Sequence, residues 1–371
     1  MIRVDWKKEL FLSTPLFLLG SNYILYNAFG NNSFKNFLRI LAILLLFTGW
    51  ILQKRHTLNR TQIVAIVIAI VVFLLNGFVA VNYAVAVSFS IFATENISET
   101  IRRAFRINLL LILILGVGLV THQIDNYRYI STTGRERWTM GFENPNVAAL
   151  FYASAIFLFL LSRKKVGKMN IGVAMLMSGV IFYYTDNRTT IVSLVIFCLY
   201  FSCMYLCRNN PKIQKNINNF CTIFVDALWI LNLVSIFVIN KFNSLDALLS
   251  YRISSFGRMI GDAGLTGFLM GGTRLTVDNF YYMFLFIHGV FPYIFMMIVT
   301  HRTMKRLVIA GHNDYIAFLL SSFLIGLMES SMLRPEIPFS LIVWKILLSD
   351  IFFDSRGDQQ VCEHPEHVKE R

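Results

Sequence analysis

Charged side chains are scarce in this chain of 371 residues, because Asp, Glu, Lys and Arg together make up only 15% of it. A water-soluble domain usually contains about 25% charged residues. Hydrophobic residues reach 56%, and they are spread along the whole chain rather than confined to one block. Soluble enzymes, nucleic-acid-binding modules and disordered scaffolds are therefore poor candidates, and the composition indicates a membrane protein.

The sequence also lacks the usual signatures of metal, redox and nucleotide chemistry. Its five cysteines form no CxxC pair and have no histidine cluster beside them, which favours packed thiols. Cys362, His364 and His367 lie together in a polar tail, where a chance grouping is a simpler interpretation than a metal site. No Walker, Rossmann, zincin or nucleophile-elbow pattern occurs in a supporting context. We therefore expect no metal and no cofactor.

Long apolar runs dominate what is present. A helix that spans a bilayer needs about 20 mostly apolar residues. Twelve such runs occur, near 10–29, 36–52, 61–76, 78–94, 104–121, 145–162, 170–185, 189–207, 220–240, 279–300, 313–330 and 336–353. The stretch 61–94 is too long for one helix, and Asn76 and Gly77 mark the turn within it. We predict an all-α polytopic membrane domain over residues 1–353 with about twelve spans, and a polar cytoplasmic tail over 354–371.

The distribution of positive charge tests this plan. The net charge is +13, which in a membrane protein is first explained by cytoplasmic loops that retain Lys and Arg. With the N-terminus inside, the inner segments hold 19 Lys and Arg and the outer segments hold 11. A single tilted helix over 61–94 would invert every later orientation and violate the rule. We therefore predict an even number of spans with both termini cytoplasmic.

The outer face has a second charge signal. From residue 122 onward its positive residues are eight Arg and one Lys, Lys241. Guanidinium groups bind phosphate and carboxylate with two parallel hydrogen bonds and stay charged near a low-dielectric surface. An anionic ligand on the outer face is one interpretation. The other is that these arginines pair with outer acids such as Asp125, Glu136, Glu143, Asp246 and Asp262.

Two outer loops, 122–144 and 241–278, are long. Loops of this length without a clear helix or strand pattern are uncommon unless they are functional. In the second we expect a short amphipathic helix over 244–259, with Leu245, Leu248 and Leu249 on one face, followed by the Gly-rich stretch 261–274. We expect that stretch to be flexible, as a hinge over a site or only as a loose connector.

Polar residues at the outer membrane boundary are the candidates for chemistry, because such groups are costly there. Asn144 and Asn146 open the sixth span, where they suit either an ordinary helix cap or a site for sugar hydroxyls or an anion. Arg188 lies in a very short outer turn, and pairing with Asp186 or with lipid phosphate is its alternative role. The remaining candidates follow the second long loop: Arg252, Arg258, Arg274, Asp278, Asn279, Tyr281, Tyr282, His288 and Glu329. The tyrosines could equally be interfacial anchors.

Taken in order, these segments resemble the Wzy-type polysaccharide polymerases of the O-antigen polymerase and ligase superfamily. The resemblance covers the whole span plan, including the long outer loop before a late helix. Locally it depends on five motifs: GFENPN (141–146), DNRTT (186–190), LLSYRI (248–253), VDNFYYMFLFIHG (277–289) and GLMES (326–330).

The resemblance implies a C-type, metal-independent, inverting glycosyltransferase of the bacterial cytoplasmic membrane. Its substrates would be undecaprenyl-diphosphate-linked glycans, as donor and as acceptor, joined on the outer face. A chain-length regulator and a flippase are the protein partners it implies, and no nucleic acid. Positive charge must stabilise the leaving diphosphate, for which we expect Arg252 and Arg188 with Arg258 and Arg274 as helpers.

The acceptor hydroxyl needs a general base. Glu329 is the first candidate, Asp278 the second and His288 the third. Asn144, Asn146, Asn279, Tyr281 and Tyr282 are expected to contact sugars or the lipid.

Two other functions share parts of this pattern. A transporter, such as a flippase of lipid-linked oligosaccharide, also has about twelve spans with both ends inside. Transporters often show internal repeats and ionisable residues near the midplane, whereas here no repeat is evident and the ionisable residues gather at one face. An O-antigen ligase is a closer alternative within the enzyme class, and the lack of any evident outer-membrane context ranks it below a polymerase.

Overall fold

The chain is almost entirely helical in the part that the computed structural model describes, residues 9–29, 34–52, 58–93, 96–130, 134–163, 166–239, 241 and 252–348. After a π-helical turn at Glu9–Ser13, the helices are α2 (Thr14–Phe29), α3 (Lys35–Leu52), α4 (Arg60–Asn76), α5 (Val81–Phe92), α6 (Ile97–Val120), α7 (Pro145–Leu161), α8 (Lys168–Thr185), α9 (Arg188–Leu206), α10 (Pro211–Ser235), α11 (Arg252–Met270), α12 (Phe280–His288), α13 (Val290–Ala310), α14 (Asn313–Gly326) and α15 (Pro338–Leu348). Short 3-10 turns occupy Gly77–Ala80 and Ser331–Leu333.

Five helical stretches in these residues are long and apolar enough to cross a membrane: Lys35–Leu52, Arg60–Phe92, Ile97–Val120, Arg188–Leu206 and Pro211–Ser235. Large apolar side chains on α4 and α6 are exposed, such as Leu74 and Leu113, and a continuous apolar surface of this kind suits lipid. A mostly helical chain, with helices suited to a membrane, is therefore confirmed. The count of twelve spans and the cytoplasmic position of both termini stay predictions.

Asparagine side chains set where many of these helices begin. In the described residues, an Asn side chain accepts a backbone N–H in the first turn of six helices; these are Asn59, Asn96, Asn144, Asn187, Asn210 and Asn279. Such caps satisfy donors that a helix start leaves without partners. Proline at the first position of α7 and α10 adds a preformed backbone angle. The polar residues of the outer motifs are thus placed by helix starts.

Of two helix breaks in the structure, one was predicted from the sequence and the other was not. The predicted turn at Asn76 and Gly77 is present, because Gly77 has a φ of 59° and α4 packs against α5. The predicted tenth span, 279–300, is wrong as one helix. It divides at Gly289, whose φ is 91°, into the short α12 and the longer α13. His288, Gly289 and Pro292 interrupt the apolar run at this point, and they were the available signal of the break.

Both long outer loops contain regular structure, of which only the amphipathic helix over 244–259 was predicted. The first holds a hairpin of β1 (Arg128–Ile130) and β2 (Glu136–Trp138), with Arg128 opposite Trp138. In the second, most of the Gly-rich stretch expected to be flexible belongs to α11, which is kinked at Gly264. Residues 252–259 of the expected amphipathic helix form the first part of α11. Its leucines, Leu245, Leu248 and Leu249, and the tail 354–371 lie outside the described residues.

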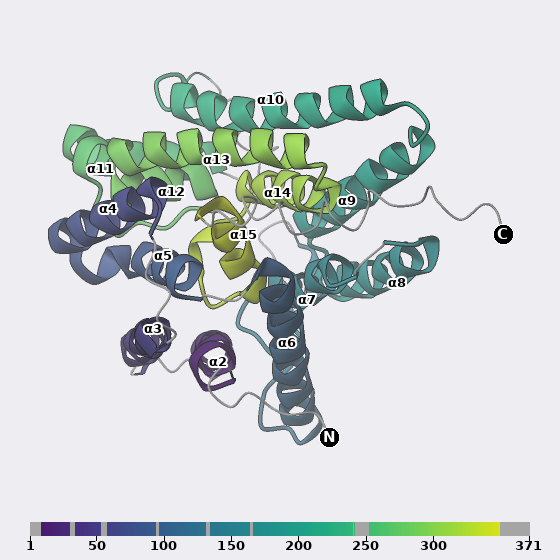
Figure 1. The fold of residues 1–371 in the computed structure, drawn as a ribbon. Helices are drawn as coiled ribbons and strands as arrows, with labels where there is room; N and C mark the ends of the chain where they lie inside the picture. The colour runs from purple at the N-terminus through teal and green to yellow at the C-terminus, as the bar shows by residue number, and fades with distance from the viewer. Residues whose placement is uncertain are drawn as a thin grey trace.

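The helices pack around a central α15 (Figure 1). Every residue of α15 is buried, and the helix contacts α5, α6, α7 and α13. The helices α10 and α13 lie side by side along the top of the view, while α2 and α3 pair below. A single large cluster of buried apolar residues runs from α2 to α15.

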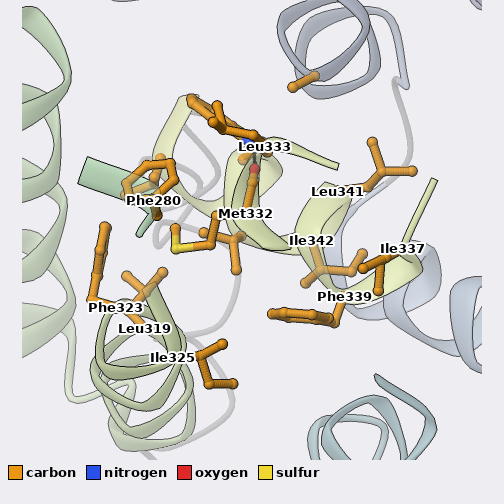
Figure 2. Packing of buried hydrophobic residues seen from close by; sticks show 14 of the residues in the cluster. Phe280, Leu319, Phe323, Ile325, Met332, Leu333, Ile337, Phe339, Leu341 and Ile342 are labelled. Carbon is orange, nitrogen blue, oxygen red and sulfur yellow. Dashed lines mark hydrogen bonds between the residues drawn. The ribbon is translucent and has the colours of Figure 1, made fainter. Parts of the chain in front are cut away.

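Part of that core lies directly behind the loop between α14 and α15. Figure 2 shows Phe323 and Ile325 from α14, Met332 from the loop and Phe339 from α15 pointing toward one another. All four side chains are at most 1% exposed. Close packing of this kind holds a loop in one conformation. It therefore fixes the segment that carries Glu329, between Ile325 and Met332.

Two glycine-containing breaks meet where α11 ends and α12 ends. The backbone N–H of Gly272 donates to the carbonyl of Ile287 over 2.9 Å, and the Asn76 side chain donates to the carbonyls of Met270 and Ile287. Gly271 has a φ of 80°, and a Cβ there would overlap the Ile287 carbonyl. The carbonyls exposed by two broken helices are thus satisfied without water, as the interior of a membrane protein requires.

Replacement of Gly271 by Ala is expected to destabilise the protein more than replacement of Gly311. Both glycines have a positive φ, 80° and 72°, so both variants bear the left-handed penalty of about 1–2 kcal/mol. Only at Gly271 would the new Cβ also clash with backbone, because Gly311 has open space around it. Thermal unfolding of the purified protein in detergent measures the difference. Equal shifts of the two midpoints would show that the junction tolerates the side chain.

Candidate functional site

A cavity of about 850 Å³ opens where the outer motifs converge. This volume is within the range of roughly 300–1,000 Å³ that small-molecule sites occupy. Its walls come from the hairpin, the first turn of α7, the α8–α9 turn, the first turn of α11, the segment 276–278 and the end of α14. Six of the predicted site residues line it: Asn144, Asn146, Arg188, Arg252, Asp278 and Glu329. The segments that carry them lie up to 185 residues apart in the chain.

One wall is a network centred on the buried Arg137 of β2. Its Nε donates to the carbonyl of Thr185 over 2.6 Å, and its Nη2 donates to Oδ1 of Asn146. The side chain of Asn187 donates to the same oxygen over 3.0 Å. The hairpin, α7 and the α8–α9 turn are therefore tied together by one guanidinium and two amides.

The α8–α9 turn places two more arginines at the cavity. Asp186 ends α8 in a left-handed conformation with a φ of 43° and accepts from Arg135 over 2.8 Å. Arg188 lies 3.7 Å from the other oxygen of Asp186, and its side chain is 71% exposed. Pairing with outer acids, the alternative interpretation of the arginines, thus applies firmly to Arg135 and only loosely to Arg188. The Arg188 guanidinium retains most of its capacity to bind an anion.

Arg252 begins α11 and contacts the turn that follows α14. One of its terminal nitrogens donates to the carbonyl of Met328 over 2.9 Å. The remaining N–H groups of a guanidinium can serve a second acceptor. The side chain is half-buried and lines the cavity. Arg252 is therefore both anchored and able to meet a ligand.

Glu329 lies just beyond the end of α14 and is the most enclosed acid of the cavity. It is 6% exposed. Burial and the nearby Asp278 raise the pKa of Glu329 to about 8, while Arg252, Arg334 and a hydrogen bond from Asn187 oppose the increase. A carboxyl group with such a pKa can hold or release a proton near neutral pH, as general acids and bases do.

Asn279 has a positioning role rather than the predicted contact with substrate. It is 3% exposed and does not line the cavity. Its amide donates to the carbonyl of Leu327 and to Oδ1 of Asn232, each over 3.1 Å. Since Arg252 holds the next carbonyl, that of Met328, the turn that presents Glu329 is fixed by two side chains.

Five other predicted site residues also lie outside the cavity lining: Arg258, Arg274, Tyr281, Tyr282 and His288. Arg258 and Arg274 are exposed. Tyr281 is fully buried and donates to the carbonyl of Phe323, and the Tyr282 hydroxyl pairs with Ser235 over 2.7 Å. The ring of His288 packs against Tyr83 and Phe284, and neither ring nitrogen has a partner in the described residues. The apolar packing of α12 explains these three positions.

The sequence analysis missed Arg135, Arg137 and Asn187 as cavity residues. Arg135 and Arg137 stand two apart, so an extended segment would present both on one side. That spacing was the available signal, but a strand of three residues is too short to show an alternating pattern. Asn187 precedes Arg188 in the motif DNRTT and could have been predicted as its helix cap.

The cavity combines four arginines with three acids: Arg135, Arg137, Arg188 and Arg252 with Asp186, Asp278 and Glu329. Two of the arginines are committed to internal partners, which leaves Arg188 and Arg252 for an external anion. Among the described residues, no three His, Cys, Asp or Glu side chains are grouped as a metal site would require. Amide groups of Asn144 and Asn146 add donors and acceptors that suit sugar hydroxyls.

The chain matches no protein-family model. No curated protein and no solved structure matches it either. The resemblance to polysaccharide polymerases accordingly stays a prediction from the motifs.

Proposed function

We propose that this protein polymerises undecaprenyl-diphosphate-linked oligosaccharide repeat units into a surface polysaccharide at the outer face of the bacterial cytoplasmic membrane. The observation that carries the proposal is the convergence of Arg188, Arg252 and Glu329 in one cavity, from segments far apart in sequence. Two arginines suit a diphosphate, and an acid with a raised pKa suits proton transfer. The motif order adds to this support, because it is that of the polymerase family.

The reaction would be an inverting glycosyl transfer. A hydroxyl oxygen of the acceptor sugar forms a bond to C1 of the donor sugar, while the bond from C1 to the diphosphate oxygen breaks. The electron pair leaves with the diphosphate, whose growing charge Arg188 and Arg252 stabilise in a site partly closed to water. Deprotonated Glu329 takes the hydroxyl proton, and Asp278 lies beside it as the second acid.

The decisive experiment uses purified protein in detergent with undecaprenyl-diphosphate-linked repeat units and no membrane compartments. We expect products whose masses rise by whole repeat units. A flippase would leave single repeats under these conditions, because transport changes no covalent bond. A ligase would require a different lipid acceptor, so elongation on repeat units alone excludes it. Failure under conditions in which a known polymerase elongates the same substrate would contradict the proposal.

A further inference from the structure

A second cavity, of about 290 Å³, lies next to the first. The two share Thr276, Val277 and Asp278, so one extended segment of the chain separates them. The other walls come from α2, the first turns of α3 and the segment Ser330–Glu336. The charge analysis assigns Lys35, Arg39 and Arg334 of this lining to the outer face, as it does the arginines of the first cavity.

The second cavity has more positive than negative charge. Arg39 and Glu336 form a buried ion pair, with Nε 2.6 Å from Oε1. Arg334 interacts electrostatically with Tyr23, Glu329 and Glu336, and the Lys35 ammonium lies 3.6 Å above the Tyr26 ring. Within the described residues, no carboxylate lies at ion-pair distance from Lys35 or Arg334. Arg39 and Arg334 both repel Lys35.

The lining holds three cations, Lys35, Arg39 and Arg334, and two carboxylates, Asp278 and Glu336. Because Glu336 is paired with Arg39, a further anion beside Lys35 and Arg334 would be favourable, since partly buried charge needs compensation. The rest of the lining indicates what carries that anion. Asn22, Asn27 and Asn82 offer amides, and the Oδ1 atom of Asn82 is buried without a partner in the described residues. Amides and tyrosine hydroxyls supply the convergent polar groups that orient a hydroxyl-rich ligand.

We propose that the second cavity binds an acidic sugar, of the hexuronic acid class, within the acceptor repeat unit. Its volume suits one sugar, being at the small end of the range for ligand sites. Lys35 and Arg334 would bind the carboxylate, and the asparagines would bind the hydroxyls. This inference rests on the proposed function, since it takes the first cavity as the place where the diphosphate leaves.

The shared segment 276–278 gives the inference a geometric consequence. Asp278 faces both cavities and lies close to Glu329. A sugar held in the second cavity would place the neighbouring sugar of the same glycan against the acids of the first. The acidic sugar in the second cavity would therefore adjoin the sugar whose hydroxyl reacts. The positive charge of the second cavity would select acceptors that contain such an acidic sugar.

Binding of methyl β-D-glucuronide to the purified protein, measured by saturation-transfer NMR in detergent, tests this assignment. Methyl β-D-glucoside is the neutral control probe, and inorganic pyrophosphate reports on the first cavity. We expect the glucuronide to bind and the glucoside to give no comparable signal. Lys35→Gln and Arg334→Gln should each weaken glucuronide binding by about tenfold or more, as the loss of a charged hydrogen bond does. Lys35→Arg should retain binding, and Arg128→Gln, which alters an exposed arginine outside both cavities, should leave it unchanged.

Pyrophosphate binding distinguishes loss of the second cavity from loss of the fold. It should persist in Lys35→Gln, which alters only the second cavity, and disappear in Arg252→Gln, which alters the first. Two results would each overturn the inference: a glucuronide signal no stronger than that of the glucoside, or glucuronide binding that is unaffected in Lys35→Gln. Displacement of glucuronide by pyrophosphate, with pyrophosphate binding lost in Lys35→Gln, would identify a phosphate site instead. Glucuronide binding without elongation of lipid-linked repeats would leave this sugar site in place and reject the polymerase proposal.

Discussion

Replacement of Arg252 by Lys or by Ala is expected to abolish polymer formation and leave single lipid-linked repeats. Loss of one well-placed donor to a developing oxyanion lowers turnover by about 100- to 1,000-fold. Lysine keeps the charge but cannot hold Met328 and an external anion with one planar fork. Both variants should therefore fail by a similar factor. Elongation of lipid-linked repeats by purified variants, compared at equal protein concentration, measures the loss.

Arg128→Gln is the matched control for Arg252. Arg128 is also an outer arginine, but it lies in the hairpin, is paired with Glu136 over 3.1 Å and is well exposed. Surface ion pairs of this kind contribute roughly 0–1 kcal/mol, so this variant should elongate like the original protein. Polymer of normal length from both Arg252 variants would exclude Arg252 from the reaction. Failure of all variants, including the control, would indicate a general loss of folding.

The sequence predicted the parts of the site that depend on local rules. Asn144 before Pro145 is a helix start that can be recognised from residue type alone. The break at Gly77 followed from the length of the apolar run. Sorting residues by membrane side then placed Arg188, Arg252, Asp278 and Glu329 on one face, which is a necessary condition for the cavity that they share.

The parts that could not be predicted depend on contacts between distant segments. Tyr281 and His288 belong to an apolar run with no polar periodicity, so its sequence does not show which residues face a cavity and which face Trp229 or Tyr83. Arg137 can be buried because Thr185 of α8 and Asn146 of α7 accept its hydrogen bonds. The Gly-rich stretch after Gly261 forms a helix because α11 packs against α12 and α13, which outweighs its weak helix propensity.

Asn279 illustrates how a motif residue can matter without touching a ligand. The family pattern made Asn279 a candidate for substrate binding, but its side-chain amide donates hydrogen bonds to Asn232 and to the carbonyl of Leu327. Its effect on chemistry passes through the turn that carries Glu329. Arg252 donates a hydrogen bond to the carbonyl of Met328 in the same turn. The position of Glu329, the candidate base, therefore depends on that of Arg252, which is a candidate to bind the diphosphate.

Glu329→Gln is expected to lower kcat/KM for elongation by about 100- to 10,000-fold, which is the usual contribution of a general base. The pH dependence gives the sharper test. Because the pKa of Glu329 is about 8, most of the free protein holds this proton at neutral pH. The value of kcat/KM should therefore rise as pH increases and level off above about 8. In Glu329→Gln the residual rate should lack this step, whereas Glu329→Asp should keep a shifted one.

The same raised pKa predicts an opposite trend for stability. Between the ordinary glutamate pKa of 4.5 and about 8, the folded protein retains a proton that the unfolded chain has released. The folded state thus binds more protons in this window, so the contribution of Glu329 to the free energy of unfolding decreases as pH rises. The Glu329→Gln variant has no titrating proton at this position. The difference between its thermal unfolding midpoint and that of the original protein should therefore shift in favour of the variant as pH increases toward 8. Activity that rises while relative stability falls, over one pH range and through one residue, would mark Glu329 as an enclosed base. A pH profile unchanged by Glu329→Gln would exclude Glu329 as the general base.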